Sequence, residues 1–264
     1  MGDSGGGGRG AGAAGSAPGA VRRNDLGQPI GPAVADWTGA RAPSRTSIEG
    51  VSCRLEPLEV MRHAQALYDA CAEDREGRLF TYLSYGPFES VEDYAAWMRG
   101  MCADPDLQPF AIVEAGDGRP VGVASYLRAA PAAGSIEVGH LCYAPALQRT
   151  RAATEAMFRM MARAFEEWGY RRYEWKCDAL NGPSRAAATR LGFRYEGTFR
   201  SHLVTKGRNR DTAWYSIVAG EWPALRRAFE AWLAPGNFDG SGRQRQTLAT
   251  WMPDSAGAPL VIDV

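Results

Sequence analysis

The sequence predicts an α/β (α+β) domain in which helices cover both faces of a mixed sheet of about seven strands. Segments with apolar residues every three or four positions alternate along the chain with short runs of strand-forming residues. Apolar residues make up 45% of the 264 residues and charged residues 23%, which is ordinary for a globular protein. The length suits one large domain or two small ones.

Composition divides the chain into four parts. Residues 1–22 are rich in glycine and alanine, have almost nothing to bury, and are expected to be disordered. Residues 23–47 hold prolines among polar residues and predict an extended arm, with a flexible linker as the alternative. The folded domain is expected over 48–234, and a polar C-terminal tail over 235–264.

The first half of the folded domain is expected to contain a strand, two helices and a hairpin. Apolar residues at helical spacing predict the first helix, and Ser90 with Asp93 resembles a capping box that starts the second. A glycine-rich turn joins the two strands of the hairpin. The expected elements are, in chain order, 51–55, 58–71, the helix after Ser90, 110–114 and 121–127.

Residues 136–154 predict a strand, a short turn and the start of a helix. The strand-forming run ends at Pro145, and the helix over about 152–168 carries a methionine stripe typical of a core face. Gly169 suits the position just after the helix. The N-terminus of a helix presents unpaired backbone N–H groups and a partial positive charge, so this turn suits a phosphate.

The remainder of the domain is expected to contain three strands and two helices. A short helix follows the turn Asn181-Gly-Pro-Ser184, and Pro223 is well placed in the first turn of the last helix. The expected strands are 171–178, 194–205 and 212–219, and the last helix is 222–233.

Charge and cysteine usage exclude several classes of protein. Lysine plus arginine equals aspartate plus glutamate, at 30 each, so no bulk charge indicates nucleic acid or an anionic membrane. No apolar run approaches the ~20 residues of a membrane span, and no N-terminal apolar core indicates a secretory signal. The five cysteines form no Cys-x-x-Cys pair and the three histidines lie far apart. We therefore expect reduced thiols, no metal site and a cytoplasmic protein, either monomer or homodimer.

Three motifs follow one another in an order that a known superfamily shares. They are Gln148-x-x-x-x-Ala153 after the central strand, Asn181-x-x-Ser184 after the next strand, and Leu191-Gly192-Phe193. This order resembles the GNAT superfamily of acetyl-CoA-dependent N-acetyltransferases. Within it, the chain looks most like the branch of the ribosomal-protein N-terminal acetyltransferases. The stretches 172–185 and 206–216 are similar to a widespread subgroup of that branch.

The resemblance implies a fold and a reaction. It implies a GNAT fold, in which the central strand and the 171–177 strand splay apart and the pantetheine arm of acetyl-CoA lies between them. It also implies transfer of the acetyl group to a primary amine, on a small molecule or a protein N-terminus, by direct attack in a ternary complex. The alternative is a GNAT-fold coenzyme A-binding or regulatory protein with little or no catalysis.

The same resemblance implies a coenzyme site around the turn before the central helix, where backbone N–H groups cradle the pyrophosphate. Arg151 stands where glycine is usual, and Arg149 and Arg151 are either direct phosphate contacts or solvated surface charge. Asn181 is expected to hold the coenzyme through its side-chain amide, with a turn-forming role as the alternative. The expected coenzyme contacts are Leu141, Cys142, Tyr143, Gln148, Arg149, Thr150, Arg151, Ala152, Ala153, Thr154, Asn181 and Ser184.

Three residues are candidates for catalysis. An alkyl amine must lose a proton before it attacks a thioester, and Glu137 lies where the resemblance implies a general base. The alternative for Glu137 is a strand carboxylate paired with an arginine. His140 points to the opposite face by strand alternation, unless a bulge turns it inward as a base or water-holder. Ser184 would protonate the departing thiolate, because Ala188 stands where many members carry a tyrosine; a helix N-cap is its alternative role.

The acceptor side is expected between an aromatic loop and a basic turn. Tyr82, Tyr85 and Phe88 belong to the loop between the first two helices, which walls the acceptor side in this fold. The 206–211 turn, with Arg208 among its cations, would favour an acidic acceptor, unless it is a solvated hairpin. An open groove between loop and turn would favour a peptide, and a closed pit a small molecule.

Overall fold

The computed structural model describes residues 22–254. Most of the N-terminal segment predicted to be disordered, and the end of the predicted tail, lie outside the described residues. The chain divides into two compact units, residues 1–38 and 39–264, and the second unit contains the large sheet.

In the first unit, a short hairpin stands where the sequence predicts an extended arm. Strand β1 (Arg22–Arg23) pairs antiparallel with β2 (Pro29–Ile30). The Asn24 Oδ1 atom accepts hydrogen bonds from the backbone N–H groups of Leu26 at 3.1 Å and Gln28 at 2.9 Å, which closes the turn. The expectation of an extended arm is therefore wrong at its start.

The second unit is built on an eight-stranded sheet in the order β3-β4-β5-β6-β7-β8-β10-β9. The neighbouring strands β7 and β8 run parallel and the other pairs antiparallel, so the sheet is mixed as predicted. The strand beyond the predicted seven is β3, which is too short for a sequence pattern. The strands are β3 (Ile48–Glu49), β4 (Cys53–Pro57), β5 (Leu107–Glu114), β6 (Pro120–Ala130), β7 (Ser135–Tyr143), β8 (Arg172–Asp178), β9 (Arg194–Thr205) and β10 (Arg208–Val218).

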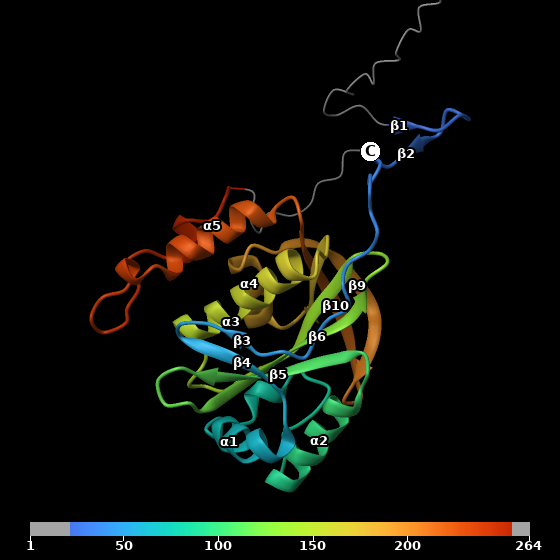
Figure 1. Cartoon of the computed structure of the whole chain (residues 1–264). Coiled ribbons are helices and arrows are strands. Elements are labelled where there is room, and N and C mark those ends of the chain that lie inside the picture. Colours follow the sequence, from blue (N-terminus) through green and yellow to red (C-terminus); the bar gives the residue numbers. More distant parts are fainter. Residues whose placement is uncertain (1–21, 255–264) are drawn as a thin grey trace, which may run out of the picture. The chain divides into compact units, whose positions relative to one another are not determined.

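Helices cover both faces of this sheet: in Figure 1, α1 and α2 lie below it, and α3, α4 and α5 lie above it. One buried cluster lies between the sheet and the helices α1 and α2. A larger one lies between the sheet and the helices α3, α4 and α5. The predicted methionine stripe, with Met157, Met160 and Met161, belongs to this larger core. The helices are α1 (Val60–Ala72), α2 (Val91–Ala103), α3 (Arg151–Ala162), α4 (Gly182–Arg190) and α5 (Trp222–Leu233).

Local sequence signals account for several helix ends. The Ser90 Oγ atom accepts a hydrogen bond from the Asp93 backbone N–H at 3.1 Å and donates one to its carboxylate at 2.7 Å, so the predicted cap of α2 is present. Helix α3 continues as a π-helical turn, Arg163–Glu167, before Gly169 reverses the chain with a φ of 74°. Pro223 lies in the first turn of α5 as predicted.

The two central strands separate where the resemblance implies that they should. Strands β7 and β8 pair over 135–138 and 172–175, and β7 then continues to Tyr143 without this partner. On its other edge β7 has a bulge: Gly139 lies opposite Ser125 and Cys142 opposite Val123, so β7 carries one extra residue. His140 lies in this bulge with a left-handed φ of 49°.

Two residues of the predicted polar tail, Asn237 and Leu248, are buried, although most of its described residues are exposed. Leu248 is 1% exposed and belongs to the larger core. The Asn237 side chain donates hydrogen bonds to the carbonyl oxygens of Trp232 at 2.9 Å and Gln246 at 3.1 Å. The folded region therefore extends past residue 234, because one leucine in an otherwise polar stretch reaches the core beside α5.

Candidate active site

One cavity of about 2150 Å³ is lined by residues from both faces of the sheet and by both edges of the gap between β7 and β8. A single small ligand takes roughly 300–1,000 Å³, so the cavity has room for two substrates. One side is formed by α3, α4 and the C-terminal segment, and the other by residues 73–85 and the β9–β10 hairpin. The predicted site residues in its wall are Tyr82, Tyr85, Glu137, His140, Leu141, Cys142, Tyr143, Gln148, Arg149, Thr150, Arg151, Ala153, Thr154, Asn181 and Ser184.

The turn before α3 leaves two backbone amides available. Thr150 caps the helix, since its Oγ1 atom accepts a hydrogen bond from the Ala153 N–H at 3.1 Å and donates one to the Leu147 carbonyl at 2.7 Å. Within residues 22–254, the N–H groups of Arg151 and Ala152 have no acceptor. Together with the partial positive charge of the helix end, these amides suit a phosphate.

The two arginines of this turn differ in position. The Arg151 Nη2 atom donates to the Leu233 carbonyl at 2.5 Å, and its guanidinium lies 4.4 Å from the centroid of the Phe238 ring. Its side chain thus extends to the C-terminal segment. The arginine that stands in the usual glycine position therefore does not fill the turn. Arg149 is exposed and has a left-handed φ of 61°, a conformation that costs a non-glycine residue some strain.

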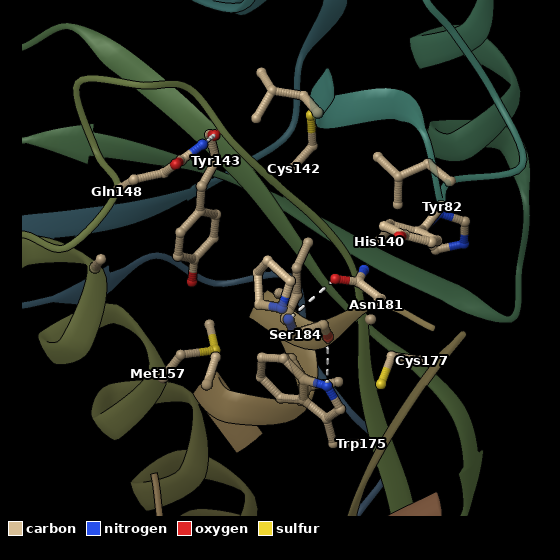
Figure 2. Close-up of a pocket in the computed structure, with 18 of the residues that line it drawn as sticks. Tyr82, His140, Cys142, Tyr143, Gln148, Met157, Trp175, Cys177, Asn181 and Ser184 are labelled. Carbon is tan, nitrogen blue, oxygen red and sulfur yellow. Dashed lines mark hydrogen bonds between the residues drawn. The ribbon is translucent and has the colours of Figure 1, made fainter. Parts of the chain in front are cut away.

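The unpaired part of β7 suits an extended amide chain. Beyond Val138 the strand has no ladder partner on its β8 side, so backbone groups on that edge can bind a ligand. The Gln148 side chain donates to the Tyr143 carbonyl at 2.9 Å and so holds the turn to the strand (Figure 2). The Cys142 Sγ atom lies 4.0 Å from Cys71 Sγ. The hydrogen bond to Cys71 and burial raise the pKa of the Cys142 thiol, so the thiol is a poor nucleophile.

Asn181 and Ser184 lie at the start of α4, facing the cavity (Figure 2). The Asn181 Oδ1 atom accepts the Ser184 N–H at 3.1 Å, which makes Asn181 the N-cap, while its Nδ2 group has no acceptor among the described residues. The Trp175 Nε1–H donates to Ser184 Oγ at 3.0 Å. The Ser184 hydroxyl is thereby oriented as an acceptor toward Trp175, and it also hydrogen-bonds to the Cys177 thiol.

Asn181 has two roles that substitution can separate. Asn181→Asp keeps the capping oxygen and removes the Nδ2 donor, so we expect acetyl-CoA affinity to fall about tenfold with stability unchanged. Asn181→Ala removes both, so stability should also fall by about 1 kcal/mol. Titration calorimetry and thermal unfolding measure the two effects. Unchanged affinity in Asn181→Asp would leave Asn181 only its capping role.

His140 is turned into the cavity by the β7 bulge. Its ring stacks on Tyr85, with centroids 5.7 Å apart and an interplanar angle of 18°. Burial, and then the charge of Arg128, lowers the pKa of His140 below its usual value. A neutral imidazole beside the gap between β7 and β8 can accept a proton, which is the bulge-dependent alternative that the sequence left open.

Glu137 is 4% exposed and held by two cations. The Arg128 Nη1 atom lies 2.8 Å from each carboxylate oxygen, and Lys176 Nζ lies 2.8 Å from Oε2. Lys176 also contacts Glu174 at 2.9 Å and lies 3.7 Å from the centroid of the Trp214 ring. Both oxygens of Glu137 are therefore engaged, which corresponds to the ion-paired alternative rather than to a carboxylate ready to take a proton.

Two of the predicted acceptor contacts are placed outside the cavity. Phe88 packs among aromatic rings of the core, with centroid distances of 5.1 Å to Tyr94 and 5.4 Å to Trp97. The Arg208 Nη2 atom donates to the Thr81 carbonyl at 2.7 Å, so it joins the β9–β10 hairpin to the 78–82 segment. Lys206 does the same through the Phe80 carbonyl at 2.8 Å. Phe88 and Arg208 lie away from the cavity for the same reason: each has its partner within the protein, aromatic rings for Phe88 and a backbone carbonyl for Arg208.

Sequence reasoning missed Lys176 and Trp214, which line the cavity. They face each other across β8 and β10, and Arg210, which belongs to the predicted basic turn, lies on the same face of β10. Strand alternation could have placed them on one face, but the pairing of β8 with β10 was needed to bring them to the site.

Across residues 22–254, no helix is long and apolar enough to cross a bilayer. No group of three or more histidine, cysteine, aspartate or glutamate side chains that could hold a metal ion occurs in the same part of the chain.

Comparison with known proteins identifies a family. The profile described as "Acetyltransferase (GNAT) domain" matches residues 53–194. A crystal structure of a GCN5-related N-acetyltransferase from Brucella melitensis is 43% identical, covers 83% of this chain and 99% of its own, and has a TM-score of 0.81. A probable acetyltransferase of the GNAT family from Chromobacterium violaceum is 40% identical, covers 75% of this chain and 98% of its own, and has a TM-score of 0.69.

A more distant structure concerns the expected branch. A putative ribosomal-protein-serine acetyltransferase from Vibrio cholerae is 19% identical, covers 65% of this chain and 97% of its own, and has a TM-score of 0.56. At this identity the likeness shows the fold alone. No curated protein matches the chain. The profile match over more than half of the residues and the likeness to the Brucella melitensis structure place this chain in the GNAT family of acetyltransferases, which transfer an acetyl group from acetyl-CoA.

Proposed function

We propose that this protein transfers the acetyl group of acetyl-CoA to a primary amine by direct attack within a ternary complex. The observation that carries the proposal is the place of His140. The bulge turns its imidazole into a cavity that also contains the unpaired edge of β7 and the free amides before α3. A base and a coenzyme site thus share one space large enough for both substrates.

Each step uses a group in the wall of the cavity. His140 takes a proton from the acceptor ammonium, and the neutral amine attacks the thioester carbonyl carbon. A backbone N–H of β7 near Leu141 or Cys142 stabilises the oxyanion that forms. When the tetrahedral intermediate collapses, the carbon–sulfur bond breaks and Ser184 donates its proton to the thiolate. The nitrogen, which carries an excess proton after the attack, releases that proton to water, and Ser184 regains a proton from water. The products are the N-acetyl amine and coenzyme A.

The acceptor that fits best is a small molecule. Lys206 and Arg208 hydrogen-bond the β9–β10 hairpin to the carbonyl oxygens of Phe80 and Thr81, so the hairpin and this segment are joined here, which favours a small acceptor over an extended peptide. The resemblance to the ribosomal-protein branch favours a protein N-terminus instead, and we keep it as the second candidate acceptor. The two are separated by comparing free amines with peptides of increasing length.

Two measurements test the proposal in sequence. Calorimetric titration with acetyl-CoA should give micromolar binding, and an amine panel should then cause release of free coenzyme A. Binding without amine-dependent release would instead support a coenzyme A-binding or regulatory protein. Absence of binding would remove the coenzyme site itself.

A further inference from the structure

Most cations around the acceptor side of the cavity are already neutralised or hydrogen-bonded. Arg128 and Lys176 hold Glu137, with Lys176 also on Glu174. Lys206 and Arg208 donate to backbone carbonyl oxygens outside the cavity wall. These residues have no donor capacity that requires a ligand.

Arg210 differs from all of these. Its guanidinium has no hydrogen-bond acceptor and no carboxylate partner among residues 22–254, although its Nε atom is fully buried. Trp214, four residues further along β10, also has a buried Nε1–H without an acceptor among residues 22–254. Both residues line the cavity. A buried donor without an acceptor costs about 1–3 kcal/mol, so such a pair is expected to find its partner in a ligand.

These donors lie on the side of the cavity where we place the amine that accepts the acetyl group. Arg210, Thr212 and Trp214 alternate along β10 and therefore share a face of the sheet. Trp214 carries Lys176 on its ring at 3.7 Å, and Thr212 Oγ1 lies 2.9 Å from His202 Nδ1. This face is opposite to the one that packs on α3 and α4, where Cys177 and Trp175 are buried.

A planar guanidinium and an indole N–H offer only donors, so they bind an acceptor group, and the positive charge of the guanidinium favours an oxyanion. Arginine binds a carboxylate through two parallel hydrogen bonds, which fixes both the position and the orientation of the ligand. We propose that the acceptor carries a carboxylate in addition to its amine and that Arg210 binds this carboxylate. The acceptor class is then an amino acid or a similar small amino-carboxylate. This inference rests on the proposed acetyl transfer and names its second substrate.

The wild-type enzyme provides the first test. Free coenzyme A release is measured for the natural amino acids, for their amides, and for the amines formed by decarboxylation. We expect kcat/KM for the best amino acid to exceed that of its amide and its decarboxylated amine by about 10- to 100-fold, as for a hydrogen-bonded charge pair. An amide or decarboxylated amine that reacts equally well would overturn the proposal, as would faster turnover of a phosphate-bearing amine.

Arg210 is then replaced in the full-length chain. Arg210→Gln should raise KM for the amino acid about 10- to 100-fold and remove the preference over its amide, with little change in kcat for the amide. Arg210→Lys keeps the charge but loses the paired geometry, so it should recover part of the preference. The matched control is Arg200→Gln, because Arg200 is exposed on the same hairpin and does not line the cavity.

The outcomes separate this inference from the proposed function. Failure to bind acetyl-CoA would remove the proposed function. Tight acetyl-CoA binding without acetylation of any amino acid would overturn only the acceptor class. An Arg210→Gln enzyme that retains the full preference for the carboxylate would overturn the role of Arg210, whatever the class of the acceptor.

Discussion

Replacing His140 by asparagine should lower kcat by about 10²–10⁴-fold, the usual contribution of a general base. Asparagine tolerates the left-handed backbone of the bulge, where φ is 49°, better than alanine does. It cannot accept a proton at neutral pH, so the base is lost while the bulge is kept. Steady-state kinetics measures the effect, and acetyl-CoA titration is the control, since the coenzyme affinity should stay within about twofold.

The pH dependence gives this prediction a second readout. Burial, and then the charge of Arg128, lowers the pKa of His140 below its usual 6.5. The histidine acts as a base when it is neutral, so activity is present above the lowered pKa and is lost as the pH falls through it. The acid limb of the wild-type profile should therefore lie below pH 6.5, and His140→Asn should lack this limb. An unchanged acid limb in the variant would remove His140 as the base.

Replacing Glu137 by alanine should lower the free energy of unfolding by about 3 kcal/mol, near the lower end of the range for a broken buried ion pair. The carboxylate is 4% exposed, and its loss leaves Lys176 with Glu174 alone. The side chain of Arg128 is 61% exposed, so water solvates its guanidinium when the carboxylate is removed. The loss of stability therefore stays near the lower end of that range. Denaturant unfolding measures the change.

Glu137→Gln separates this structural role from catalysis. The amide keeps a hydrogen-bond acceptor but loses the charge, so stability should fall by less than in Glu137→Ala. If Glu137 only positions Arg128 and Lys176, kcat per folded molecule should fall much less than in His140→Asn. A stable Glu137→Gln enzyme that loses its kcat and the acid limb of its pH profile would make Glu137 the base instead of His140.

The elements that the sequence predicts best are those with long periodic patterns. Helix α5 is found at Trp222–Leu233, as the apolar spacing and Pro223 predict, and the Ser90 cap begins α2. The strands of the sheet are found with ends shifted by a few residues. The strand β3 and the packed segment around Leu248 were missed, because two paired residues or a single buried leucine leave no periodic pattern.

The candidate site shows the same division. Asn181, Ser184 and the turn before α3 follow from local motifs, because a helix N-terminus and its cap are properties of a few neighbouring residues. Arg208 could not be excluded from the sequence, because its partner, the Thr81 carbonyl, is distant in the chain. The partners of Phe88 are close in sequence, but the packing of its ring on Tyr94 depends on how the loop folds onto α2.

The sequence by itself determined the fold class, the order of the helices and strands, and the helix N-terminus at the turn before α3, since each depends on hydrophobic periodicity and on local backbone chemistry. Only the tertiary structure showed that Glu137 is ion-paired and that His140 lines the cavity. A bulge is defined by the pairing of β7 with β6, and an ion pair by the meeting of β6, β7 and β8. The unpartnered guanidinium of Arg210 was decided in the same way, because a missing acceptor is a property of the whole packed environment and not of the neighbouring residues.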